Sequence, residues 1–210
     1  MKHIKLFEQF ILKEEAPKLS AKDIFIPRRL KERWDDLLIP YLNKGYTKDQ
    51  IYVSKDFNEF ISINNTNVKE FKDIKVIIGG VRINGDILKE LNLEEVSGEF
   101  NCSFNGLTSL KGSPTISNGD FSCFHNKLTS LEGGPTISNG DFSCSTNDIT
   151  SLVGAPTIVN GDFKCSYNII TSIEGAPKIV KGDFMIIDNV KKFTEEEIRG
   201  IVDIKGEVYF

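Results

Sequence analysis

The sequence lacks an apolar run of about 18 residues, the length that a membrane-crossing helix needs, so we expect no membrane partner. It also lacks a basic excess. Its 26 lysines and arginines face 30 aspartates and glutamates, a net charge of −4, so we expect no nucleic-acid partner. The two histidines, His3 and His125, lie far apart, and no nucleophile elbow, phosphate-binding loop, zinc-finger spacing or dinucleotide fingerprint occurs. We therefore expect a protein that is not an enzyme and needs no cofactor or metal.

A repeat dominates what the sequence does contain. A 21-residue segment occurs four times in succession, over 98–118, 119–139, 140–160 and 161–181, and a fifth, partial copy begins at Gly182. A fixed period of this length is typical of a solenoid of stacked coils. Each coil is too small to bury its own apolar residues, so neighbouring coils must share one interior. The sequence thus predicts a mainly β repeat solenoid with a parallel ladder and with its function on an exposed face.

The repeats divide the chain into four segments. We expect a helical N-terminal region over 1–70, entry strands with a degenerate coil over 71–97, and the repeats over 98–190. The last segment, 191–210, predicts a cap made of a helix and a strand, because a capping-box sequence begins at Thr194.

The first residues of the chain predict an amphipathic helix. Ile4, Phe7 and Ile11 fall at helical spacing among lysines, and an alanine-proline break follows the helix. Two interpretations stay open at this stage. The helix either docks on the protein's own core, or serves as a detachable address tag, since it resembles the short helices that direct internal proteins of tailed bacteriophages into the capsid.

Two residue types recur at core positions of the repeat. A phenylalanine is the third residue of each copy, and a cysteine follows two residues later, at Cys102, Cys123, Cys144 and Cys165. We interpret the cysteines as buried free thiols, because cysteine is readily buried. Disulfides and a metal site are the alternatives. Parallel stacking keeps the thiols from pointing at each other, and a 21-residue spacing lacks the close pairs of a zinc site.

Each copy also carries an asparagine where the chain must leave the strand, and an amide there can bond main-chain groups of the adjoining coil. The pattern Phe-x-Cys-x-x-Asn-x-Leu/Ile-x-x-Leu/Ile resembles the leucine-rich repeat over about 98–190, in the short 21-residue form of bacterial and tailed-phage proteins. The resemblance implies a protein-interaction scaffold without catalytic residues. It also implies a structural role for this asparagine ladder: Asn105, Asn126, Asn147, Asn168 and Asn189.

The positions that vary between copies predict the binding surface. Side chains alternate along a strand, so residues between the inward rows should face the concave strand surface. Exposed aromatic side chains are frequent interface anchors. We expect a protein partner to contact Phe104, Phe124, His125, Thr146, Lys164, Tyr167 and Met185.

A row of acidic residues precedes the inward phenylalanines, at Glu99, Asp120, Asp141, Asp162 and Asp183. Repulsion between neighbours about 5 Å apart costs only about 1 kcal/mol per pair in water. Two interpretations of this acidic ladder stay open. The carboxylates either bond the backbone at the Gly-Asp turn, or bind a cation or a basic partner.

The sequence favours a non-catalytic scaffold in the cytoplasm of a bacterial or phage-infected cell, binding a host or phage protein. A structural virion component directed by the first helix and a non-enzymatic secreted effector are the alternatives. The sequence leaves the partner's identity and the oligomeric state open.

Overall fold

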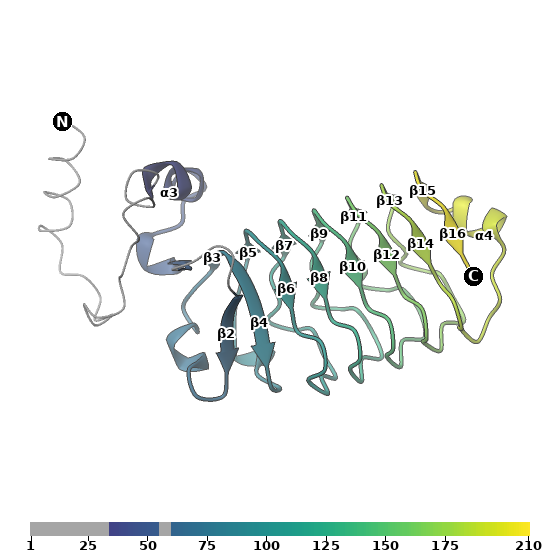
Figure 1. Cartoon of the computed structure of the whole chain (residues 1–210), viewed down its shortest axis with the longest axis horizontal. Coiled ribbons are helices and arrows are strands. Elements are labelled where there is room, and N and C mark those ends of the chain that lie inside the picture. The colour runs from purple at the N-terminus through teal and green to yellow at the C-terminus, as the bar shows by residue number, and fades with distance from the viewer. Residues whose placement is uncertain (1–33, 55–59) are drawn as a thin grey trace, which may run out of the picture.

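A computed structural model describes residues 34–54 and 60–210 of the chain as a parallel β-solenoid with about seven coils (Figure 1). Strands of successive coils form two parallel, eight-stranded sheets. We call them sheet A and sheet B. Sheet A contains β1 (Ile51–Val53), β3 (Val76–Ile78), β5 (Glu95–Val96), β7 (Ile116–Ser117), β9 (Ile137–Ser138), β11 (Ile158–Val159), β13 (Ile179–Val180) and β15 (Asp203–Ile204).

Sheet B contains β2 (Phe60–Asn64), β4 (Gly80–Asn84), β6 (Phe100–Asn101), β8 (Phe121–Ser122), β10 (Phe142–Ser143), β12 (Phe163–Lys164), β14 (Phe184–Met185) and β16 (Val208–Tyr209). The expected mainly β solenoid is confirmed. The pairing is in register at the repeat spacing, so Phe142 pairs with Phe121 on one side and with Phe163 on the other. Equivalent residues of successive coils therefore stack directly on each other.

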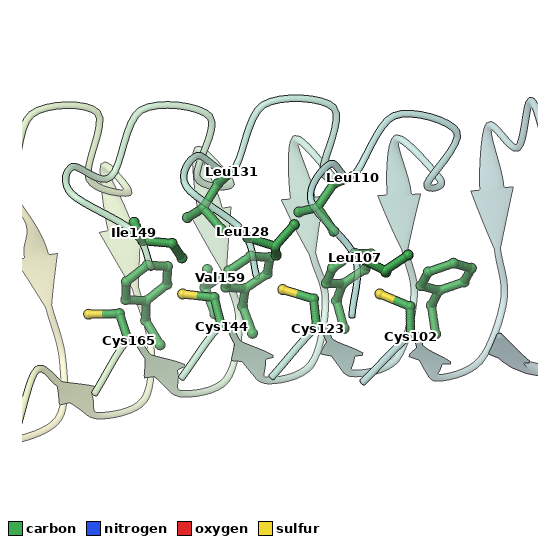
Figure 2. Packing of buried hydrophobic residues seen from close by; sticks show 14 of the residues in the cluster. Cys102, Leu107, Leu110, Cys123, Leu128, Leu131, Cys144, Ile149, Val159 and Cys165 are labelled. Atoms are coloured by element: carbon green, nitrogen blue, oxygen red, sulfur yellow. The ribbon is translucent and has the colours of Figure 1, made fainter. Parts of the chain in front are cut away.

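Stacked side chains fill the interior between the two sheets. The phenylalanine at the third position of each copy is fully buried, and the ring centroids of successive phenylalanines lie 5.1 to 5.5 Å apart. Figure 2 shows the cysteines in a second row along the solenoid axis, with Leu107, Leu128 and Ile149 in the same interior. Each residue type thus packs against copies of itself, and one continuous core results.

The four cysteines are free and buried, as expected. Burial raises the pKa of each thiol, because a thiolate would lose its hydration there. Two of the thiols donate to carbonyl oxygens of the following coil, Cys123 to Ser143 at 3.4 Å and Cys165 to Met185 at 3.3 Å. These thiols act as packing residues and not as nucleophiles.

Replacing Cys144 with serine is expected to lower the free energy of unfolding by about 1 to 3 kcal/mol, because a hydroxyl is costly to bury in an apolar row. Thermal denaturation of the variant beside the parent protein measures the loss. Cys144→Ala is the matched control, since it removes the sulfur without adding a polar group. A melting temperature unchanged by Cys144→Ser would contradict the apolar character of the row.

The N-terminal region differs from the expected helical segment over 1–70. Its described part contains one α-helix, α3 (Trp34–Leu42), and three-residue 3-10 turns at η1 (Lys48–Gln50) and η2 (Val68–Glu70). The strands β1 and β2 already belong to the two sheets, so the solenoid begins at Ile51. The helical expectation is therefore wrong over 51–53 and 60–64. These coils lack the 21-residue spacing, and only their pairing with β3 and β4 reveals them.

Helix α3 covers the outer face of sheet A at its N-terminal end. Leu38 and Tyr41 are buried against Ile51, Val76 and Ile78. The loop after the helix adds polar contacts to the same end of the sheet, where Tyr46 donates a 2.9 Å hydrogen bond to Glu94. Burial and this hydrogen bond raise the pKa of Tyr46 to about 12. The amphipathic segment around Ile4, Phe7 and Ile11 lies outside the described residues.

The solenoid passes through η3 (Leu88–Glu90) before the repeats and ends in the expected helix-strand cap. Helix α4 (Glu195–Arg199) begins at a capping box in which the Thr194 hydroxyl accepts from the Glu197 amide, and the Glu197 carboxylate accepts from the Thr194 amide. Ile198 lies fully buried over the end of the core. The Arg199 guanidinium donates to the carbonyl oxygens of Ile204 and Gly206 in the last coil. Such contacts protect an edge that would otherwise invite further strand pairing.

Candidate interaction surface

The outer face of sheet B carries the residues that the sequence analysis placed in a binding surface. Its strands alternate between buried phenylalanines and outward-facing residues. We call the outward residues the strand row, and their register is continuous along the sheet. The strand row consists of Ser62, Arg82, Asn101, Ser122, Ser143, Lys164 and Met185. Small polar side chains make up most of the strand row, so few side chains project far from this face of the sheet.

A second row borders the face where each coil leaves sheet B. Its members have left-handed backbone conformations, with φ between 51° and 61°, and all of them are exposed. We call them the edge row: Phe104, His125, Thr146, Tyr167 and Asp188. The left-handed conformation costs a residue other than glycine roughly 1 to 2 kcal/mol. It recurs in five successive coils, so the solenoid imposes it and thereby turns these side chains outward.

The sequence argument assigned these residues to the surface by strand alternation. That reason holds for Lys164 and Met185, and the alternating burial continues past β8 to Phe124. The strands end before the edge row begins, and the left-handed turn orients the edge row instead. The amides of the edge row donate to carbonyl oxygens of the next coil, for example His125 to Ser145 at 3.0 Å and Tyr167 to Ile187 at 2.8 Å. The backbone beneath this row is therefore held in place.

Three of the expected aromatic residues form a cluster. The Phe104 ring centroid lies 4.7 Å from that of Phe124, in an edge-to-face arrangement, and 4.7 Å from that of His125. Phe104 nevertheless remains 65% exposed. Tyr167, two coils beyond His125, is 57% exposed and lies beyond Thr146 in the same row. Exposed aromatic area thus occurs at two places along one row.

The asparagine ladder joins neighbouring coils beneath the edge row. The Asn147 amide nitrogen donates to the carbonyl oxygens of Cys123 and Cys144, at 3.1 and 3.0 Å, and its oxygen accepts from the Leu128 amide at 3.0 Å. Equivalent contacts occur at Asn126, Asn168 and Asn189. The side chains satisfy main-chain groups that no strand partner reaches, so this geometry is structural.

The acidic ladder borders the opposite edge of the face. The Asp120 Oδ1 oxygen accepts from the Asp141 amide at 2.9 Å, and the contact repeats from Asp141 to Asp162 and from Asp162 to Asp183. Each aspartate therefore bonds the backbone of the next coil, which is the first of the two interpretations left open. The glycine before the aspartate is required, since a Cβ on Gly140 would collide with Asp120 Oδ1.

The second carboxylate oxygen of each aspartate is available for other contacts. The Lys164 ammonium lies 2.5 Å from Asp141 Oδ2 and 3.3 Å from Asp162 Oδ2. Burial by itself raises the pKa of Asp141, but the hydrogen bonds from Lys164 and from the Asp162 amide lower it overall. Lys164, predicted as a partner contact, is thus occupied by two aspartates of its own chain.

Two features of the surface were missed at the level of the sequence. A second asparagine row borders sheet A, where Asn139 donates to Asn118 at 2.8 Å and Asn160 donates to Asn139 at 2.6 Å. The asparagine before Gly-Asp at Asn118, Asn139 and Asn160 is its sequence signal. Lys44 pairs with the buried Glu95 at 2.6 Å, a contact between residues far apart that no motif indicates.

Within residues 34–54 and 60–210, no three His, Cys, Asp or Glu side chains gather as metal ligands. His125 contacts Phe104 and lies in the edge row. No helix of the described ranges is long and apolar enough to cross a membrane.

Comparisons of the chain with protein-family models, curated proteins and solved structures found no match.

Proposed function

We propose that this chain is a non-catalytic scaffold that binds a protein partner through the outer face of sheet B. One observation carries the proposal: the edge row exposes Phe104 and Tyr167 on a backbone that the solenoid holds in place. Exposed aromatic residues on a rigid frame bind with little loss of conformational entropy. The partner would contact Phe104, Phe124, His125, Thr146, Tyr167 and Met185.

We further propose that the repeats are of the short leucine-rich type, with phenylalanine and cysteine in strand positions that leucine usually holds. The asparagine ladder supports this proposal, because it recurs in register and bonds neighbouring coils. The free, buried cysteines favour a reducing compartment, the cytoplasm of a bacterial or phage-infected cell. A virion role depends on the first helix, which lies outside the described residues.

A triple variant of the edge row tests the function. Phe104→Asn, His125→Asn and Tyr167→Asn together remove the exposed rings, and asparagine tolerates the left-handed backbone better than most residues. The tagged parent and the variant are used for affinity capture from bacterial lysate, and any retained protein is then purified for a direct affinity measurement. We expect the variant to keep its melting temperature and to bind at least 30-fold more weakly, a loss typical of one anchoring residue.

The matched control replaces two exposed apolar residues outside the edge row, Ile169→Thr and Val190→Thr, which are 44% and 65% exposed in the parent. This control should retain the partner. Equal binding by the edge-row variant and the parent would refute the assignment of the surface.

A further inference from the structure

Two rows of different chemistry border the outer face of sheet B. The acidic ladder runs along one edge, and the edge row with its exposed rings runs along the other. Within one coil, a ladder residue and its edge-row residue, such as Asp120 and His125, are five positions apart. Five positions span about 16 Å in an extended chain. The strand row between them is mainly serine and asparagine. The face is therefore a shallow strip with an acidic side and an aromatic side.

The acidic side faces the same surface as the strand row. Lys164 belongs to the strand row and reaches Asp141 Oδ2 and Asp162 Oδ2. Asn101, from the same row, donates to Glu99 at 3.1 Å. The Asp141 and Asp162 oxygens that do not bond the backbone thus point toward the strip.

Lys164 also shows that the acidic ladder binds a cationic side chain. Its ammonium lies between two successive carboxylates of the ladder, within 4 Å of both. The Asp120 and Asp183 Oδ2 oxygens have no hydrogen-bond or ion-pair partner among the described residues. A cation therefore already occupies one part of the ladder, and equivalent places remain on either side of it.

We propose that the partner presents a basic amphipathic helix, which lies along the solenoid axis with cationic side chains on the acidic ladder and apolar side chains on the edge row. This inference rests on the proposed function, because it names the chemistry of that partner. A helix with its side chains is about 10 to 12 Å wide, which fits the strip. One helical turn rises about 5.4 Å and successive strands lie about 4.8 Å apart, so cations one turn apart meet successive aspartates over about three turns.

Lys164 competes with such a helix for Asp141 and Asp162. Replacing Lys164 with serine frees both carboxylates. The repeat already accepts serine at the equivalent positions Ser122 and Ser143. We expect Lys164→Ser to bind a basic helix about fivefold to tenfold more tightly than the parent, with a steeper dependence on salt.

The probe is a synthetic 18-residue helical peptide with leucines along one side and lysines along the other, and its control carries glutamates in place of the lysines. Fluorescence anisotropy at several salt concentrations measures binding to the full chain. Asp120→Asn with Asp183→Asn keeps an oxygen acceptor for the backbone amide and removes two charges. We expect this variant to bind the lysine peptide about fivefold to tenfold more weakly, and the glutamate peptide not to bind.

Two sets of outcomes separate this inference from the proposed function. Equal binding of both peptides, or no effect of Lys164→Ser and of the Asp→Asn pair, overturns the basic helix. If the partner captured from lysate is still lost with the edge-row variant but retained by the Asp→Asn pair, the scaffold function stands and the basic helix falls. If the captured partner is retained by both variants, both proposals fall.

Discussion

Replacing Phe142 with alanine is expected to lower the free energy of unfolding by about 3 to 5 kcal/mol, the usual cost of removing a buried aromatic ring. Phe142 is fully buried between Phe121 and Phe163, with ring centroids 5.4 and 5.5 Å away and ring planes nearly parallel. The neighbouring rings are fixed by their own coils, so they cannot close the cavity. The loss also interrupts the core that the coils share.

Equilibrium denaturation in urea, followed by circular dichroism, measures this loss. Val153→Ala is the matched control, because Val153 is an apolar residue of the same repeat copy, 140–160, and is 37% exposed. Surface changes of this kind remain within about 0.5 kcal/mol. A loss below about 1 kcal/mol for Phe142→Ala would mean that the stacked rings are not a continuous interior.

Replacing Asn147 with alanine is expected to lower the free energy of unfolding by about 1 to 3 kcal/mol. The side chain is 8% exposed and bonds the carbonyl oxygens of Cys123 and Cys144 and the amide of Leu128. Each buried polar group left without a partner costs about 1 to 3 kcal/mol. Alanine leaves the Leu128 amide without its acceptor, whereas the Cys123 and Cys144 carbonyl oxygens still accept from Asn126 and Asn168.

Asn139→Ala is the control for Asn147→Ala. Asn139 also makes two hydrogen bonds, to Asn118 and Asn160, but its side chain is exposed and water can replace them. We expect it to cost less than about 1 kcal/mol. Equal losses for Asn139→Ala and Asn147→Ala in the same denaturation experiment would contradict the distinction between the buried ladder and the outer row.

Much of the fold could be predicted from the repeat. Identical spacing of Phe, Cys and Asn predicts that each residue type stacks on itself, and the phenylalanine contacts follow that rule. The parallel ladder was likewise predicted, and the strands of sheets A and B pair in parallel from coil to coil. The first coils were not predicted, because β1 and β2 follow a different spacing and sequence, and only their long-range pairing identifies them.

The candidate surface was predictable in its residues but not in its geometry. Phe104, Phe124 and His125 were selected as variable positions, and the structure brings their rings together. Lys164 was selected for the same reason, yet it bonds the aspartates of its own chain. A sequence pattern indicates which residues lie on a face, whereas the direction of a long charged side chain depends on the charges around it.

The sequence by itself determined the coil length, the content of the interior and the positions free to vary, because a 21-residue period constrains each residue to stack on its equivalent in the next coil. The tertiary structure alone decided the left-handed turn that exposes the edge row and the pairing of Lys164 across two coils. It also decided how α3 covers sheet A. These features depend on main-chain hydrogen bonds between coils and on contacts between distant residues, which no local sequence preference specifies.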